Sequence, residues 1–329
     1  MVKTMKNNIK LVISCCLIIL TTLIFSDKIS DFLANIVSQN LVTQKSNGNE
    51  YTKSYDYEFF DINKNQSPLS YNELIGSIYE AINNKETTYT FYCPSEYTDC
   101  IKDIEEISDN ALLLTHLNNF VHPYNSFTNI KTIINESGEI NLNITYLYSE
   151  DEINKINNKI DIIIQETINE DMDDYEKLKA IHDYIINNTK YDVKRNESGE
   201  SNHESYKASG ALLEGIATCN GYADALAIIL SKLGYDNFKI ATTPEEISYE
   251  STGHVWNAVK YEDNWVHIDL TWDDPVSKDN KDYLYHKYFL VNNEEMAEAD
   301  SGEVKIEEHN YDKTIYVELN QQKNLIVNN

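Results

Sequence analysis

The sequence predicts an α+β fold, in which a mixed core of helices and strands follows a smaller N-terminal α+β subdomain. In several segments of ten or more residues, apolar side chains recur every three or four positions, as on one face of a helix. Other short segments alternate apolar and polar residues, as strands do. With 329 residues, 41% of them hydrophobic, the chain is long enough to bury such a core.

Acidic residues dominate the charge of the chain. It has 27 Lys and Arg against 54 Asp and Glu, a formal net charge of -27. This charge repels phosphate backbones, so nucleic acid is excluded as a partner, and we interpret the carboxylates as a solvated surface. No segment carries the alternating Asp/Asn ladder with a glycine that a calcium loop needs. We therefore predict no metal and no cofactor.

Residues 1–25 are interpreted as a membrane-targeting segment, either a signal peptide or a membrane anchor. Lys3, Lys6 and Lys10 precede an uncharged run over 11–25. Those fifteen residues span about 22 Å as a helix, less than the roughly 30 Å hydrocarbon core, which suits a cleaved signal or a short anchor. Because no A-x-A-like cleavage site is visible near Phe25, we favour the anchor. The rest of the chain is then expected to be extracellular, membrane-anchored or secreted.

Composition divides the remaining chain into four parts. Residues 26–70 are polar and rich in Asn, Lys, Ser and Tyr, which predicts a stalk. Residues 71–150 combine helical spacing with the strand-like segments TTYTFYC and NITYLYS, which predicts an N-terminal α+β subdomain of unknown role. Residues 151–310 are expected to form the main domain, and 311–329 a C-terminal tail.

Two helices are predicted at the start of the main domain. Ser149 and Glu152 form a capping box for the first, which runs to about residue 169. The second begins near residue 171, and its apolar stripe consists of Tyr175, Leu178, Ile181 and Ile185. His182 lies beside this stripe and is interpreted as a packed structural histidine.

The five cysteines differ in their surroundings. Cys15 and Cys16 lie in the apolar N-terminal run, while Cys93 and Cys100 are close enough to close a small loop in an oxidising compartment. Cys219 has no obvious mate. Taken alone, it is either a small buried hydrophobic residue or a reactive thiol.

The segment GIATCNGYADALAIILSKLGY predicts a helix with Cys219 in its first turn. Thr218 is expected to cap this helix, and Gly234 to end it as a C′ residue. Unpaired N–H groups and the positive end of the helix dipole favour a thiolate at this position. Cys219 is therefore placed as a nucleophile would be.

The segment GHVWNAVKYEDNWVHIDLTWDDP predicts a hairpin that carries histidine and aspartate. A thiolate that attacks an amide needs an imidazole, which in turn needs a carboxylate or amide to fix its tautomer. With a two-residue loop we expect Ala258 to face Asp269. His254 is then four residues away, too far for a direct hydrogen bond without a bulge or a longer loop. His267 is a rival imidazole, and the residue pattern favours His254 only modestly.

Three segments together resemble the bacterial transglutaminase-like superfamily: GIATCNGYADAL at Cys219, GHVWNAV at His254 and WVHIDLTWDDP at Asp269. The similarity extends over about residues 170–300, with KLKAIHDYIINNTKYD upstream and YHKYFLVNNEEM downstream. It implies a papain-like, transglutaminase-like core, in which the cysteine helix packs against a small antiparallel sheet that bears the other two residues.

The resemblance also implies roles for these residues. Cys219 is the expected nucleophile, His254 the general base and acid, and Asp269 the residue that orients His254, in preference to His267. The backbone N–H of Cys219 is a natural donor to an oxyanion, while a second donor is unassigned. Tyr191 and Trp256 are equally interpretable as walls of the site and as packing aromatics.

The function expected from these residues is that of a surface-exposed cysteine acyl-transfer enzyme. It would act on protein or peptide amides, such as those of cell-wall or surface proteins, through a thioester. Passage of the acyl group to water makes a peptidase or amidase, and passage to an amine makes a transglutaminase. The alternative is a non-catalytic cell-surface binding or assembly module that retains the fold without turnover.

Overall fold

The computed structural model describes seven stretches of the chain: residues 48–61, 67–135, 138–193, 203–243, 253–276, 283–301 and 306–321. It divides the chain into residues 1–47 and a compact unit from Gly48 onward. The expected membrane-targeting segment and the first part of the expected stalk lie outside the described residues. Within the seven stretches, no helix is both long and apolar enough to cross a bilayer.

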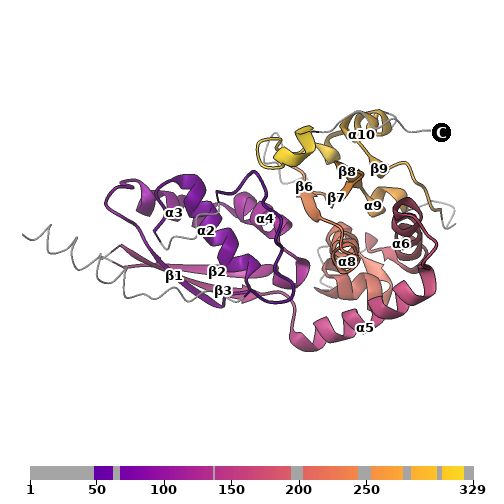
Figure 1. Ribbon diagram of the computed structural model, residues 1–329, viewed down its shortest axis with the longest axis horizontal. Coiled ribbons are helices and arrows are strands. Elements are labelled where there is room, and N and C mark those ends of the chain that lie inside the picture. The colour runs from indigo at the N-terminus through magenta and orange to yellow at the C-terminus, as the bar shows by residue number, and fades with distance from the viewer. Residues whose placement is uncertain are drawn as a thin grey trace, which may run out of the picture. The chain divides into compact units, whose positions relative to one another are not determined.

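The N-terminal subdomain is a three-stranded antiparallel sheet in the order β1-β3-β2, with three helices along one face (Figure 1). Its elements are α2 (Tyr71–Asn83), β1 (Thr88–Tyr92), α3 (Cys100–Asp109), α4 (Ala111–Phe120), β2 (Phe127–Ile134) and β3 (Glu139–Tyr146). Every second residue of β3 from Ile140 to Ile144 is buried, so this face packs against the helices. The segment IEEISDNALLLTHL contributes to two helices, α3 and α4, because the side chain of Asn110 caps α4 by accepting from the N–H of Leu113.

Residues 48–61 differ from a polar stalk. Tyr57 and Phe60 are buried in the same apolar cluster as the subdomain helices. The Tyr57 hydroxyl donates to the carbonyl of Asn237 at 3.1 Å, which ties this segment to the main domain. Tyr57 and Phe60 therefore help to hold a stretch of mostly polar composition against the core.

Cys93 and Cys100 form a disulfide, with their Cα atoms 5.6 Å apart. The bridge links the residue after β1 to the first residue of α3. Cys219 is the free cysteine of the described residues.

The main domain opens with α5 (Glu150–Thr167) and α6 (Asp174–Asn188). Ser149 caps α5 as predicted, accepting from the N–H of Glu152 at 3.4 Å. Helix α6 begins later than predicted, because Asp173 and Glu176 form a reciprocal capping box. Tyr175 is 45% exposed and does not belong to the buried stripe of this helix.

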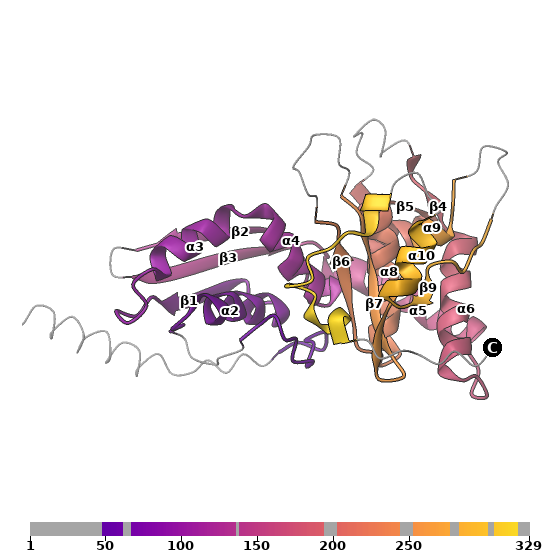
Figure 2. The same ribbon diagram turned by 90° about the horizontal axis from the view of Figure 1, so that it is seen from above.

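A four-stranded antiparallel sheet in the order β6-β7-β8-β9 forms the second part of the main domain. Helix α8 packs against β6 and β7 on one side and contacts α6 (Figure 2). These elements are β6 (Asn237–Ala241), β7 (Val255–Tyr261), β8 (Asn264–Ile268), β9 (Phe289–Val291) and α8 (Cys219–Lys232). A short parallel pair, β4 (Lys190–Tyr191) and β5 (Ile216–Ala217), precedes α8.

The remaining described elements are short. They are η1 (Pro123–Asn125), η2 (His203–Tyr206), η3 (Gly210–Glu214), α9 (Leu270–Asp273), α10 (Asn293–Asp300), η4 (Ile306–His309) and η5 (Val317–Gln321). Mixed helices and strands in this arrangement agree with the predicted α+β class.

The C-terminal end of α8 agrees with the prediction, whereas the predicted N-cap does not. Gly234 ends the helix as expected, with φ of 87° and a bond from the N–H of Tyr235 to the carbonyl of Leu230. Thr218 occupies the N-cap position but its side chain caps nothing. Its hydroxyl instead donates to the carbonyl of Ser205 at 3.3 Å, so the start of α8 is tied to η2.

The hairpin register corrects the predicted one. Glu262 and Asp263 form a two-residue turn with positive φ, which pairs Tyr261 with Asn264 and Ala258 with His267. Ala258 thus pairs with a residue two positions earlier than the predicted Asp269. If the same register is continued beyond the strands, His254 lies diagonally across from position 269, so the two side chains can meet without a bulge. The second strand of the hairpin, β8, ends at Ile268, because Asp269 is the N-cap of α9.

The expected C-terminal tail contributes to the core. Tyr316 and Leu319 are completely buried. The Tyr316 ring lies 5.4 Å from that of Phe120 in α4 and 5.8 Å from that of Phe238 in β6. Because Phe120 and Phe238 are also in contact, three distant segments meet in one aromatic cluster.

Candidate active site

Cys219 is the first residue of α8, and its side chain is half-buried. The first N–H groups of a helix have no acceptor within the helix, so they are available to a negatively charged atom. Gly221, two residues after Cys219 in α8, is packed closely against neighbouring backbone. A Cβ on Gly221 would lie 2.5 Å from the carbonyl oxygen of Ser205, so only glycine allows this approach.

His254 lies between Cys219 and Asp269. Its Nε2 is 2.5 Å from Oδ2 of Asp269, and its ring is close enough to the Cys219 side chain for the cysteine to raise its pKa. Since Nε2 faces the carboxylate, Nδ1 is the nitrogen left for the sulfur. The ring stacks on that of Trp256, with centroids 5.6 Å apart and planes 13° apart, which fixes its orientation.

The electrostatics of this pair favour an imidazolium. Burial by itself lowers the pKa of His254, but the Asp269 carboxylate and Cys219 more than offset it and hold that pKa well above its ordinary range. For Asp269, burial raises the pKa, and the neighbouring His254 and His309 reverse the shift, so that its pKa lies below the ordinary range. The site therefore holds a carboxylate against a protonated ring.

Both oxygens of Asp269 are occupied. Oδ1 accepts from the backbone N–H groups of Thr271 at 2.8 Å and Trp272 at 3.1 Å. Oδ2 accepts from His254 and from Nε2 of His309 at 2.9 Å. The carboxylate is thus fixed by the first turn of α9 on one side and by two imidazoles on the other.

The rival histidine has a structural role. His267 is fully buried, and its Nδ1 accepts from Nε1 of Trp256 at 3.1 Å. Its Nε2 donates to Oδ1 of Asn293 at 2.8 Å. Burial lowers the pKa of His267 to about 4, so the ring is neutral and both nitrogens are used.

His309 and Asp300 are site residues that the sequence did not reveal. Nδ1 of His309 lies 2.7 Å from Oδ1 of Asp300, while Nε2 reaches Asp269. His309 follows Asp269 by 40 residues in the acidic segment IEEHNYD, which carries no motif. Only the fold brings it to the site.

The two aromatics with open roles have different surroundings. Tyr191 pairs with Ala217 in the β4–β5 ladder, two residues before Cys219. Burial, and next the charge of Cys219, raise the pKa of Tyr191. Trp256 is 1% exposed behind His254, so it packs the ring and is no wall of an open site.

Two groups of side chains in the described stretches have the donor types that a metal would need. One is His182, Asp183 and His286, and the other is His254, Asp269 and His309. In both, the donors are hydrogen-bonded to one another, which satisfies them without an ion. His182 is fully buried and bonded through both nitrogens, which confirms its structural interpretation.

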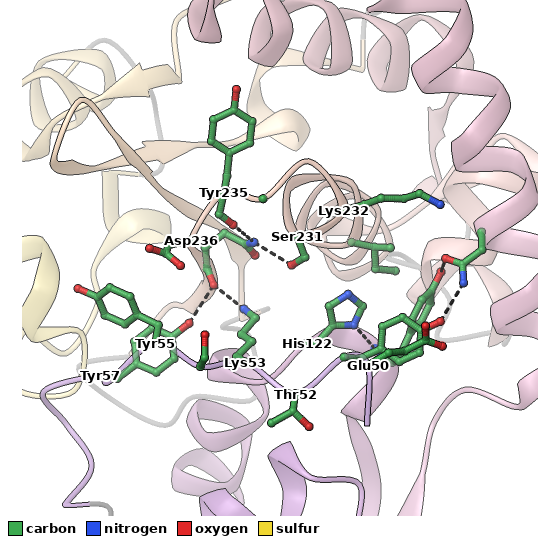
Figure 3. A pocket seen from close by; sticks show the side chains of 17 residues that line it. Glu50, Thr52, Lys53, Tyr55, Tyr57, His122, Ser231, Lys232, Tyr235 and Asp236 are labelled. Carbon is green, nitrogen blue, oxygen red and sulfur yellow. Dashed lines mark hydrogen bonds between the residues drawn. The ribbon is translucent and has the colours of Figure 1, made fainter. Parts of the chain in front are cut away.

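A cavity of about 380 Å³ lies at the opposite end of α8 from Cys219. Figure 3 shows Lys53 and His122 from the N-terminal part of the chain and Ser231 from the last turn of α8 around it. The 14 residues of α8 extend for about 20 Å, so a molecule in this cavity cannot reach the thiol.

Comparisons with known proteins agree with the geometry. The family model of the transglutaminase-like superfamily matches residues 162–270, a segment that includes Cys219, His254 and Asp269. Kyphoscoliosis peptidase from Mus musculus is 25% identical over 142 residues, 39% of this chain, and that from Homo sapiens is 24% identical over 145 residues, 40% of this chain. The matches cover only 21% of each of these relatives.

Two solved structures are also similar in part. One is a TGase, with 15% identity, coverage of 47% of each chain and a TM-score of 0.34. The other is a proposed cysteine protease from Cytophaga hutchinsonii, with 16% identity, coverage of 43% of this chain and 61% of that one, and a TM-score of 0.28.

Proposed function

We propose that this chain, whose residues 162–270 match the family model of the transglutaminase-like superfamily, is a cysteine acyl-transfer enzyme that acts on protein or peptide amides. One observation carries the proposal. A cysteine at the start of a helix is in contact with a buried histidine, whose other nitrogen lies 2.5 Å from a carboxylate. This is the arrangement that nucleophilic catalysis by a thiolate requires.

In the first half of the reaction, the Cys219 thiolate attacks the carbonyl carbon of the amide and forms a C–S bond. The negative charge passes to the carbonyl oxygen, which the backbone N–H of Cys219 is placed to stabilise. The imidazolium of His254 donates its Nδ1 proton to the amide nitrogen. The C–N bond then breaks, the amine leaves, and a thioester remains on Cys219.

In the second half, neutral His254 accepts a proton from the incoming nucleophile, which attacks the thioester carbon and displaces the thiolate. Water gives the carboxylic acid, and an amine gives a new amide. Both outcomes share every step up to the thioester. Because water is in large excess, hydrolysis results unless the protein binds an amine beside Cys219.

Asp269 supports both halves. By accepting from Nε2 of His254, it keeps Nδ1 directed at the sulfur and stabilises the positive charge of the ring. The carboxylate itself keeps its charge throughout.

We further propose that the enzyme works outside the cell, held by or released from its N-terminal apolar segment. The Cys93–Cys100 disulfide supports this location, because such bridges persist in oxidising compartments.

The test is selective alkylation combined with turnover. The protein used is the wild-type chain from about residue 45 onward, without the apolar N-terminal segment. Without reductant, iodoacetamide should modify its Cys219, while the bridged Cys93 and Cys100 should stay unmodified. Cys219→Ala should lose all turnover of peptide amides and of a glutamine donor with a labelled amine. Mass spectrometry of the products separates the acceptors, since hydrolysis adds water and transfer exchanges ammonia for the amine. Undiminished turnover in Cys219→Ala refutes the nucleophile, and an unreactive Cys219 in the wild type favours the non-catalytic binding module.

A further inference from the structure

Two imidazoles share one oxygen of the carboxylate that orients His254. Oδ2 of Asp269 lies 2.5 Å from Nε2 of His254 and 2.9 Å from Nε2 of His309. The second imidazole is itself anchored, because Nδ1 of His309 lies 2.7 Å from Oδ1 of Asp300. From the sulfur outward, the contacts therefore run Cys219, His254, Asp269, His309 and Asp300.

The hydrogen bonds fix the protonation of His309. An ionised carboxylate only accepts hydrogen bonds, so a ring with a carboxylate at each nitrogen must donate from both and is an imidazolium. The ring is buried among the aromatic rings of Trp256, Trp272 and Tyr288, whose centroids lie 5.1, 5.5 and 5.1 Å away. Those faces stabilise a cation and exclude water that would compete for Asp269.

We propose that His309, anchored by Asp300, is a positioning residue that holds the Asp269 carboxylate in the orientation that directs His254 toward Cys219. This inference rests on the proposed function. It places the end of η4 (Ile306–His309), which lies outside the matched residues 162–270, within the active site.

The charges of the contact series explain why a second imidazole is needed. In the state with a Cys219 thiolate, negative and positive groups alternate from Cys219 to Asp300, so each buried charge has an opposite neighbour. Without His309, Oδ2 of Asp269 would keep one partner in a closed apolar surrounding. The carboxylate could then rotate toward any water that enters, and His254 would lose its fixed direction.

Two substitutions of His309 distinguish a positioning role of its imidazole from a general structural role. In His309→Gln the side-chain amide can occupy the place of Nε2, which keeps a donor for Asp269 and gives up the bond to Asp300. In His309→Asn the amide occupies the place of Nδ1, which keeps the bond to Asp300 and gives up the donor to Asp269. The two variants are matched in polarity and remove the same positive charge.

The readout is the second-order rate of Cys219 alkylation by iodoacetamide, measured on variants whose thermal unfolding shows them folded. His309→Asn should slow alkylation about tenfold or more, and His309→Gln should restore it to within about threefold of wild type. With a peptide amide, kcat should follow the same order while KM stays constant. Equal rates in all three proteins, or equal losses in both variants, overturn the proposal.

A substitute variant covers a folding failure. If His309→Asn does not fold, His309→Leu fills the place of the ring without any donor to Asp269 and should show the same tenfold loss. Because alkylation needs no substrate, the two proposals fail separately. Rapid alkylation without turnover of any amide refutes the acyl-transfer function, while the alkylation rates alone still decide the role of His309.

Discussion

Asp269 shows at the scale of one residue why the site requires a carboxylate. Four donors converge on it, two backbone N–H groups at Oδ1 and two imidazole N–H groups at Oδ2. An ionised carboxylate accepts all four. An asparagine amide has one oxygen, so its NH₂ group must face donors in either orientation.

We therefore expect Asp269→Asn to lose stability as well as activity. Donors left without an acceptor in a buried site cost about 1–3 kcal/mol each, and the wrong orientation of His254 should lower kcat by at least about a hundredfold. Urea unfolding and turnover measure the two effects. Asp171→Asn, at an exposed position, is the control and should stay within about 0.5 kcal/mol of wild type. Wild-type stability in Asp269→Asn would contradict the four-donor geometry.

Single residues also show how far the sequence alone could reach. Cys219, His254 and Asp269 each stand in a segment whose residues resemble a known family, so the amino-acid sequence is enough to predict their roles. His309 stands in an acidic stretch with no such pattern, and Asp300 ends a helix rich in glutamate. Their roles depend on the packing of α10 and η4 beside Asp269, which no local spacing encodes.

At the scale of elements, α8 carries both the thiol and, two residues later, a glycine that is packed tightly against neighbouring backbone. A Cβ on Gly221 would lie 2.5 Å from the Ser205 carbonyl, 2.9 Å from the Ala217 Cβ and 3.0 Å from the Lys207 carbonyl. Two of these atoms are backbone and cannot swing away. The start of α8 can therefore pack in this way only because residue 221 is a glycine.

Gly221→Ala should be destabilised by about 1–3 kcal/mol, because the added methyl forces backbone to move. Urea unfolding checks the loss. The matched control is Gly253→Ala, since a Cβ there would meet nothing within 4 Å. If the two alanine variants unfold at the same urea concentration, the close approach at Gly221 is absent.

Elements differ in how well the sequence predicts them. The helix over 71–83 and the stripe of isoleucines in α5 follow from spacing, because a long amphipathic face leaves a strong periodic signal. The hairpin register depended on which two residues form the turn. Positive φ at Glu262 and Asp263, neither of them glycine, settles it in the structure, and their side chains gave no signal for it.

At the scale of the whole molecule, two sets of buried histidines oppose each other in their response to pH. Burial lowers the pKa of His116 and of His267 from 6.5 to about 4. For His182, His254 and His309, burial also lowers the pKa, but neighbouring carboxylates reverse the shift and raise it above 6.5. The first set is held neutral by the fold and the second is held charged.

The contribution of these five histidines to the free energy of unfolding should consequently be greatest near pH 6.5. Below it, the unfolded chain binds protons that neutral His116 and His267 refuse, so stability falls as the pH drops toward 4, by at most roughly 3 kcal/mol for each. Above it, the folded state keeps protons on the second set that the unfolded chain has released, so stability falls as the pH rises. Urea unfolding from pH 4 to 9 measures the loss of stability on the acid side and on the alkaline side of pH 6.5.

His116→Gln provides the control for the acid side. Its side chain does not titrate, so the loss of stability between pH 6.5 and 4 should be smaller than in wild type. Burial lowers the pKa of Lys53 to about 7, which adds stability as the pH rises above 7, so the alkaline side is measured in Lys53→Met. In that variant, a stability that rises continuously from pH 6.5 to 9 would contradict the raised pKa values of the second set.

The ring cluster of Phe120, Phe238 and Tyr316 limits how this gene can be shortened. A recombinant fragment that starts after the N-terminal subdomain, or one that stops at the end of the family match, would leave part of this cluster facing solvent. Such fragments should precipitate on expression even though they encode Cys219, His254 and Asp269. The smallest soluble product therefore has to run from near Gly48 to beyond Leu319, and chimaeras that exchange only the matched segment inherit the same requirement.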